Sequence, residues 1–321
     1  MDFDLTEEQR LLKESVDRLI SDRYGDFERR RAYQKEPGGW SRAVWRDFAE
    51  LGLTALPFNE AVGGINGGPV ETMIVMEAIG RGLALEPFLS TVVLAGTALA
   101  RGGNRALAEE IASKIAEGDF IVAFAQTERQ SRYELHNVGV TARRRNGHYA
   151  IEGRKSLVLH GDSAGKLLVS ARTAGAQRDR EGITLFFVDA KAPGVEIHAS
   201  ASQDGRRVAE ILLSGAEAAA SSIIGEVDGG YALLGEIVDA GIAALAAEAV
   251  GAMERLHGLT LEYLKTRKQF GVPIGNFQAL QHRAADMMIA LEQARSMAYY
   301  AAMMAQESAE RRRPALSAAK V

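Results

Sequence analysis

The residue pattern of this chain changes its character at Gly118, and this change constrains the fold more than any single motif. Before Gly118 the pattern is helical, beginning with a capping box in which Thr6 and Gln9 can satisfy each other's backbone amides. From Phe120 to Ile224 the runs become short and apolar or alternating, with Asn146-Gly147 as a hairpin signal. The sequence therefore predicts helices first and a small antiparallel β domain second.

A second change at Tyr231 returns the pattern to long helices. An alanine-rich helix is expected from about Leu233 to Arg267, and another from about Asn276 to Gln306. The fold class is thus α+β, with an N-terminal helical domain over 1–118, a middle antiparallel β domain over 119–226 and a C-terminal helical bundle over 227–321.

Composition removes several functional classes. The 321 residues carry a formal net charge of -4, with no clustered basic excess of the kind that binds nucleic acid. There is no cysteine, which excludes thiolate catalysis and disulfides. The acidic start MDFDLTEEQR is unlike a secretory signal, and no apolar run is long enough to span a membrane. We expect a cytoplasmic protein that binds neither nucleic acid nor membrane.

The segment RKQFGVPIGNFQALQHRAADM, residues 267–287, interrupts the two C-terminal helices. Together with the opening LTEEQRLLKESV and the helical, β, helical order, it resembles the acyl-CoA dehydrogenase family of flavoproteins over nearly the whole chain. Within that family the chain looks most like the small subunits of heteromeric enzymes of the pimeloyl-CoA dehydrogenase type. The resemblance implies the acyl-CoA dehydrogenase fold.

The same resemblance implies an oxidoreductase of fatty acid metabolism. It would use FAD to catalyse α,β-dehydrogenation of an acyl-CoA thioester, including a dicarboxylyl-CoA. The chain would form a homo- or hetero-oligomer with a larger acyl-CoA dehydrogenase homologue, as in a heterotetramer. Whether the chain is active by itself is left open. The alternative is a non-catalytic partner that completes the FAD or substrate site of the larger homologue.

Five residues are implied as FAD contacts by this resemblance. Arg267 matches the family position that binds the pyrophosphate, commonly across a subunit interface, and a planar guanidinium suits paired hydrogen bonds to phosphate. Gln269 and Phe270 follow as polar and stacking neighbours, and Gln278 lies at the start of the next helix. Thr127 belongs to a Thr-Glu step whose backbone and hydroxyl meet the polar edge of the flavin in relatives. For Arg267, the simpler interpretation is an exposed basic residue beside a helix turn.

The β domain departs from the family pattern near the flavin. The small, glycine-rich stretch that normally follows the Thr-Glu step is replaced by Arg129 to Tyr133. The tryptophan and threonine that cover the flavin ring in relatives correspond to Leu157 and Leu159.

No residue is identified as the catalytic base. Proton abstraction next to a thioester needs a carboxylate, which relatives supply from a late segment that would lie beyond Val321. The bundle is therefore expected to be incomplete at this end. Other relatives place the base early in the long helix, where this chain has Gly241. Asp239 aligns with a carboxylate that contacts the CoA portion, with stabilisation by a helix dipole as the alternative. Glu248 is interpreted as a packed or interface carboxylate.

Other motifs are weaker. Gly161 to Gly165 matches the G-x-S-x-G of serine hydrolases around Ser163, but a strand, not a helix, is predicted to follow. The six histidines include no pair at metal-ligand spacing, so no metal site is predicted. The glycine-rich stretch 63–68 lacks the spacing of a nucleotide fingerprint and is expected to be a loop. Arg143 to Arg145 are interpreted as a solvated face.

Overall fold

The computed structural model describes residues 4–321, which form two compact units. The helical unit comprises the described residues up to Phe27, Gly68–Ala84 and Ile242–Val321. The sheet unit comprises Glu28–Gly67 and Leu85–Gly241. These units do not follow the three sequence domains one to one, because the N-terminal helices are divided between them.

The helical unit is built from long amphipathic helices whose ends follow local rules. The predicted capping box forms at the first helix, where Thr6 Oγ1 accepts from Gln9 N at 3.2 Å and Thr6 N donates to Gln9 Oε1 at 3.0 Å. The fourth helix starts with proline, and Glu71 Oε2 accepts from Gly68 N at 2.7 Å. The unit contains α1 (Glu7–Tyr24), α4 (Pro69–Gly82), most of α7 (Tyr231–Thr266), α8 (Gln278–Met304) and α9 (Ala309–Lys320).

The structure adds three details about the helices. The charged stretch 307–313 is helical from Ala309 onward. The segment before Gly102 begins as a π-helix, Phe88–Ala95, and continues as α5 (Gly96–Arg101). The long C-terminal helix, predicted from about Leu233, begins at Tyr231.

The sheet unit holds an eight-stranded sheet in the order β6-β7-β3-β2-β4-β5-β8, with β1 paired to β4. Most pairs are antiparallel, as predicted, and Asn146 and Gly147 both have positive φ in the tight β2–β3 turn. The exceptions are β1 and β2, which pair with β4 in parallel. The strands are β1 (Val122–Ala125), β2 (Thr141–Arg145), β3 (His148–Leu159), β4 (Lys166–Arg172), β5 (Ile183–Asp189), β6 (Val195–Ala201), β7 (Arg207–Ala219) and β8 (Ile223–Ile224).

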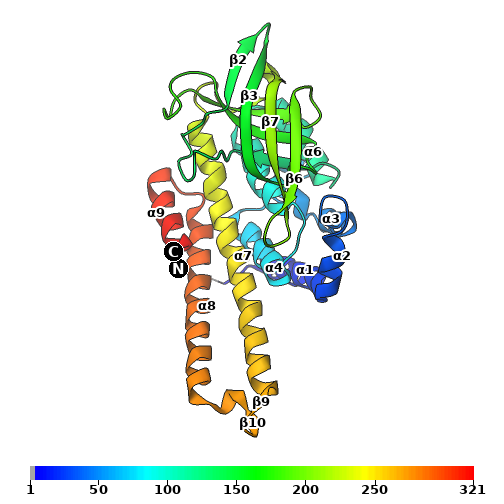
Figure 1. The fold of residues 1–321 in the computed structure, drawn as a ribbon, viewed down its shortest axis with the longest axis vertical. Coiled ribbons are helices and arrows are strands. Elements are labelled where there is room, and N and C mark those ends of the chain that lie inside the picture. The colour runs from blue at the N-terminus through cyan, green and yellow to red at the C-terminus, as the bar shows by residue number, and fades with distance from the viewer. Residues whose placement is uncertain (1–3) are drawn as a thin grey trace. The chain divides into compact units, whose positions relative to one another are not determined.

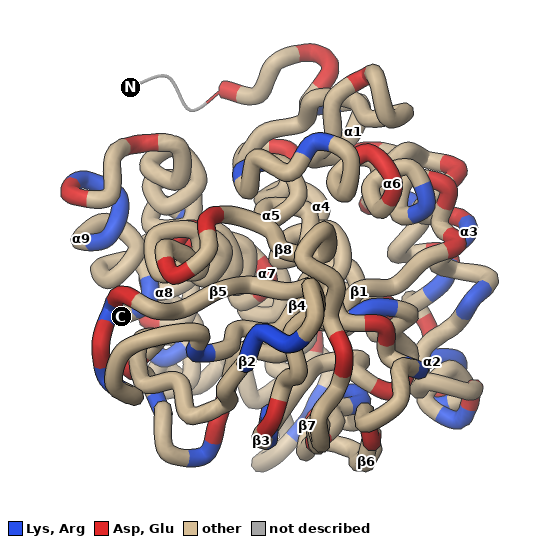
Figure 2. The backbone as a smooth tube through the Cα atoms, turned by 90° about the horizontal axis from the view of Figure 1, so that it is seen from above, with Lys and Arg blue, Asp and Glu red and all other residues tan. Residues whose placement is uncertain are grey.

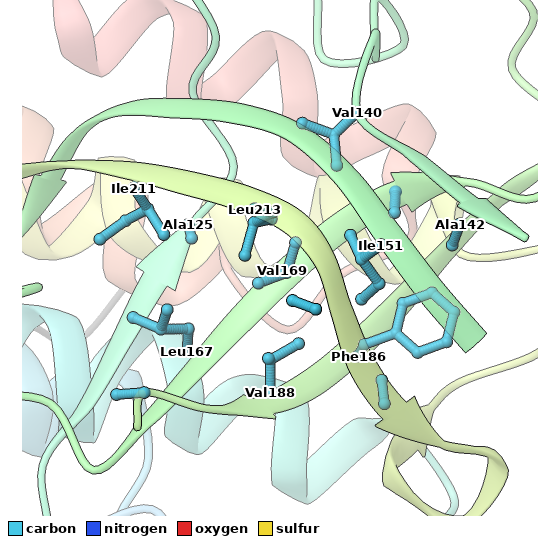
Figure 3. Close-up of a cluster of buried hydrophobic side chains, with 14 of the residues drawn as sticks. Ala125, Val140, Ala142, Ile151, Leu167, Val169, Phe186, Val188, Ile211 and Leu213 are labelled. Carbon is cyan, nitrogen blue, oxygen red and sulfur yellow. The ribbon is translucent and has the colours of Figure 1, made fainter. Parts of the chain in front are cut away.

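Two strands of this sheet, β4 and β5, are buried on both faces, which explains their continuous apolar sequences. On one face, Leu167, Val169 and Phe186 join the cluster shown in Figure 3 with Ile151 and Leu213 from β3 and β7. On the other face, alternate residues of β4 and β5 pack against helices of the same unit. These helices are α5, α6 (Arg105–Ala116) and the first part of α7. The unit also includes α2 (Phe27–Tyr33), apart from its first residue, and α3 (Arg42–Glu50).

Charges of both signs are mixed along the chain in Figure 2, and β2 carries the clearest basic run. That run is Arg143, Arg144 and Arg145, all exposed, as expected for a solvated strand end. In residues 4–321, no helix has the length and apolar character needed to cross a bilayer.

Candidate functional site

The predicted FAD contacts Arg267, Gln269, Phe270 and Gln278 lie together at one end of the helical unit. A short hairpin of β9 (Lys268–Gln269) and β10 (Val272–Pro273) joins α7 to α8 there, as Figure 1 shows. Phe270 and Gly271 form its turn with φ of 54° and 83°. A phenylalanine in this left-handed region is uncommon.

The side chains of this hairpin are turned to solvent. Phe270 is 92% exposed and contacts the Phe277 ring edge-on, with centroids 6.1 Å apart. Arg267 is exposed, and its guanidinium has no hydrogen bond or ion pair within the described part of the chain. Its backbone is fixed, because its N–H donates to Tyr263 O and its carbonyl accepts from Ile274 N at 2.8 Å. A held backbone with an unused guanidinium suits the binding of an external anion.

Thr127 belongs to the sheet unit, in the loop that follows β1. Its carbonyl accepts from Ser156 N at 2.8 Å, and its hydroxyl makes one long contact of 3.4 Å with Gln126 Oε1. Leu157 follows Ser156 at a break in the β3–β7 register, with a φ of 54° and 66% exposure. The half-buried Thr127 hydroxyl and the exposed Leu157 side chain thus lie on two neighbouring segments. A backbone hydrogen bond from Ser156 N to Thr127 O connects these segments.

Sequence reasoning missed the residues beneath this loop. Lys155 is completely buried, and its Nζ lies 2.7 Å from Glu128 Oε1. The available signal was the alternation of side chains between the two faces of a strand. Lys155 has the same parity in β3 as the inward-facing Tyr149 and Ile151. The sequence around it does not reveal this burial, because a lysine between Arg154 and Ser156 is typical of an exposed strand.

His160 fixes the end of the same strand to the π-helix. Its Nε2 lies 3.1 Å from Leu85 O and its Nδ1 lies 3.3 Å from Ser90 Oγ. Because a carbonyl only accepts, Nε2 carries the proton, and Nδ1 is an acceptor that faces Ser90 Oγ, whose hydroxyl also lies 3.2 Å from Pro87 O. Burial lowers the pKa of His160 to about 4, so the ring is neutral at physiological pH.

This neutral ring predicts a pH dependence of stability. The unfolded chain binds a proton at His160 near pH 6.5, but the folded chain binds it only near pH 4. Its contribution is therefore complete above pH 6.5 and falls by about 3 kcal/mol as the pH drops to 4. Denaturant midpoints measured across this range should fall more steeply for the wild type than for His160→Asn. Parallel curves would contradict the assignment.

Asp239 lies in the part of α7 that belongs to the sheet unit, and it is buried. The alternative that the helix dipole stabilises it is wrong, because α7 begins at Tyr231 and the effect is confined to the first turn. Glu248, further along α7, is half-buried, and its backbone faces Gly80 of α4.

Gly241, the position of the alternative base, is closed from one side. A Cβ built there would lie 2.8 Å from Leu94 Cδ2 of the π-helix. Sequence reasoning missed Leu94, because this contact joins residues far apart in the chain.

The serine hydrolase motif has another role. Strand β4 follows Gly161–Gly165 directly, as predicted, and Ser163 Oγ accepts from Trp40 Nε1 at 3.1 Å. The neighbouring Asp162 pairs with Arg207 at 2.9 Å. Ser163 therefore holds a buried tryptophan, and a hydrolytic site is not formed. Within residues 4–321, no three His, Asp or Glu side chains gather as metal ligands.

The glycine-rich stretch 63–68 is a loop, as expected, and Gly63 ends a single helical turn there with a φ of 78°. Nearby residues line a cavity of about 580 Å³ in the sheet unit. Its lining includes Phe58, Asn59, Asn66, Leu99, Arg105 and Glu109.

Three family models match the sequence in order. The acyl-CoA dehydrogenase N-terminal domain matches residues 6–119, the middle domain matches 123–214 and the C-terminal domain matches 228–321. The chain is 32% identical over 287 residues to acyl-CoA dehydrogenase FadE27 of Mycobacterium tuberculosis, a match that covers 89% of this chain and 72% of that protein.

Solved structures agree with these matches. The crystal structure of the ChsE4-ChsE5 complex from Mycobacterium tuberculosis has a TM-score of 0.85 at 31% identity, covering 100% of this chain and 83% of that one. The FAD complex of PigA has a TM-score of 0.89 at 25% identity, covering 99% and 84%. The helical, β and helical segments thus correspond to known relatives both in sequence and in fold, and the chain belongs to the acyl-CoA dehydrogenase family.

Proposed function

We propose that this chain is one subunit of a heteromeric acyl-CoA dehydrogenase and that Arg267 binds the diphosphate of FAD at a subunit interface. FAD is the cofactor of the family. The observation that carries the proposal is the unused guanidinium of Arg267 on a backbone held by two hydrogen bonds. Gln269 on the hairpin and Gln278 at the start of α8 are exposed and can donate to phosphate or ribose oxygens.

The sheet unit also fits the flavin. A planar ring with a polar edge needs an apolar surface beside a hydrogen-bonding group, and Leu157 and Thr127 offer these two features. When bound, the flavin accepts the β-hydrogen of the thioester as hydride. The role that we propose for Thr127 is to orient the polar edge of the ring. Phe270 supplies a stacking surface, and Asp239 is proposed to act toward the CoA portion of the substrate.

A heteromer is supported by the apolar surface of the α7–α8 hairpin. Solvent-exposed apolar side chains gathered in one region usually mark an interface. The ChsE4-ChsE5 neighbour is itself described as a complex. The resemblance to pimeloyl-type small subunits also supports a heteromer. It makes a dicarboxylyl-CoA one of the acyl-CoA thioesters to be assayed. The exposed side chains are Leu256, Leu259, Tyr263, Phe270, Val272, Phe277, Met288 and Ile289.

The proposal is tested by coexpression with the larger homologue. We expect a yellow complex that contains both chains and releases FAD on denaturation, measured by absorbance and chromatography. A colourless complex, with no flavin released, would contradict the proposal.

The contact between Gly241 and Leu94 favours a second candidate, a partner that completes the site without abstracting the proton. Gly241 carries no carboxylate, and a side chain there would require the Leu94 side chain to shift. In this case the base is supplied by the larger homologue.

We therefore expect the isolated chain to oxidise acyl-CoA thioesters only at background rate, measured with an artificial electron acceptor. Gly241→Glu should raise this rate less than Gly241→Glu/Leu94→Ala does, because the Leu94 side chain must shift to admit the new carboxylate. Robust turnover by the isolated wild-type chain would refute the partner role.

A further inference from the structure

Three successive residues, Gln126, Thr127 and Glu128, are tied to strand β3 of the sheet through Lys155 and Ser156. Lys155 Nζ donates to Gln126 O at 3.2 Å and to Glu128 Oε1 at 2.7 Å. Between these two anchors, Ser156 N donates to Thr127 O at 2.8 Å. The backbone of Thr127 is therefore held from both sides and at its own carbonyl.

The hydrogen bonds around Lys155 are those of an ammonium group. Its third acceptor is Ser170 Oγ of β4, at 2.9 Å, and three acceptors match the three N–H bonds of a charged lysine. Burial lowers the pKa of Lys155, against the attraction of Glu128. Burial also opposes ionisation of Glu128, but Lys155 holds the pKa of that carboxyl below its ordinary value. The two groups thus form a buried ion pair.

Glu128 extends this hold to the residues that lead into β2. Its carboxylate accepts from Gly139 N at 2.9 Å, Val140 N at 3.3 Å and the Gln130 side chain. Ser131 Oγ closes the loop by accepting from Glu128 N and donating to Glu128 O. Most polar groups of the loop are used internally, whereas among residues 4–321 the Thr127 hydroxyl has only its 3.4 Å contact with Gln126.

We propose that the Lys155–Glu128 pair positions Thr127 for the flavin, so that this buried pair controls how tightly FAD is retained. The inference rests on the proposed function. Lys155 and Glu128 are positioning residues, because they act through the Thr127 segment and lie beneath it. Lys155 holds Gln126 O by donating an N–H to it. Removing that donor should loosen the Thr127 segment, even in a variant where the charge of Glu128 is removed as well.

The test compares Lys155→Met with Lys155→Met/Glu128→Gln in the full chain, coexpressed with the larger homologue. The single variant leaves a buried carboxylate without its cation, so we expect both a lower denaturation midpoint and about tenfold weaker FAD binding. The double variant removes both charges, so the midpoint should recover. Because the methionine side chain has no donor for Gln126 O, FAD binding should stay weak. Equilibrium titration of the apo complex with FAD gives the affinity.

A matched control separates positioning from general weakening. Val188→Ala creates a cavity in the same sheet core, and Val188 makes none of the hydrogen bonds that hold the loop, so it should lower the midpoint with less than about twofold loss of FAD affinity. Hydrogen exchange of the Ser156, Gly139 and Val140 amides in the apo complex gives a second readout. These amides should exchange faster in both Lys155 variants.

Each outcome has a distinct meaning. If FAD affinity recovers together with the midpoint in the double variant, the pair is only structural and the inference is overturned. The same holds if Val188→Ala weakens FAD as much as Lys155→Met does. If the wild-type complex binds no FAD, the proposed function fails first, and the inference fails with it.

Discussion

Gly251→Ala is expected to destabilise the helical unit by about 3 kcal/mol, whereas Gly258→Ala on the same helix is expected to stabilise it by up to about 1 kcal/mol. The two glycines lie about two turns apart in α7. A Cβ at Gly251 would lie 1.8 Å from the carbonyl oxygen of Glu77 and 2.8 Å from Arg81 N, both in the backbone of α4. At Gly258 a Cβ meets nothing within 4 Å.

The large effect at Gly251 arises because backbone atoms lie where the methyl group would go. A glycine of α4 is packed against α7 in the same way, since a Cβ at Gly80 would lie 1.9 Å from the carbonyl oxygen of Glu248. An extra methyl group must push the two helices apart, and tightly packed interiors resist such displacement. At exposed Gly258, alanine gains helix propensity without a new contact.

Separating the helices would also disturb the ion-pair network of α4, which reaches α7 through Glu254 and α8 through Arg295. Buried Glu77 accepts from Arg81 at 2.9 Å and from Arg295 of α8 at 3.0 Å, and Arg81 pairs with Glu254 at 2.6 Å. Urea denaturation of the two glycine variants measures the difference. Equal midpoints, or a more stable Gly251→Ala, would show that α4 and α7 are not packed backbone to backbone.

The larger features of the fold were predictable because they depend on local rules. Periodicity distinguished helices from strands, the capping box at Thr6 located the first helix, and Asn146-Gly147 located a hairpin. The parallel pairing of β1 with β4 was not predicted, since it joins strands separated by an intervening hairpin.

The contacts around the candidate site depended on tertiary structure. Lys155 and Glu128 are separated by 27 positions, and no local pattern pairs them. Gly251 gave a partial signal, because a glycine inside a helix usually has a packing reason, but its partner α4 lies far away in sequence. The role of Arg267 is implied by the family resemblance. The structure adds that its backbone is held while its guanidinium has no partner among residues 4–321.

The second large effect is expected for Arg267→Gln. A guanidinium can donate two parallel hydrogen bonds to a diphosphate and carries a charge that glutamine lacks. Loss of a charge-assisted pair at an interface commonly costs about 2 to 5 kcal/mol, which corresponds to at least about thirtyfold weaker binding. Because Arg267 is exposed, the folded chain and its denaturation midpoint should be unaffected.

Lys268→Gln is the matched control for this variant. It removes the same charge from the adjacent residue of the same exposed hairpin, and Lys268 is not among the proposed FAD contacts. Arg267→Lys tests geometry, since it keeps the charge but loses the planar pair of donors. Its flavin content should lie between those of the wild type and Arg267→Gln.

The most direct measurement is the flavin released per complex by wild type, Arg267→Gln and Lys268→Gln, each purified with the larger homologue under identical conditions. We predict near-stoichiometric FAD for the wild type and Lys268→Gln, and almost none for Arg267→Gln. Full flavin occupancy in Arg267→Gln would contradict the proposal that this arginine binds the diphosphate of FAD.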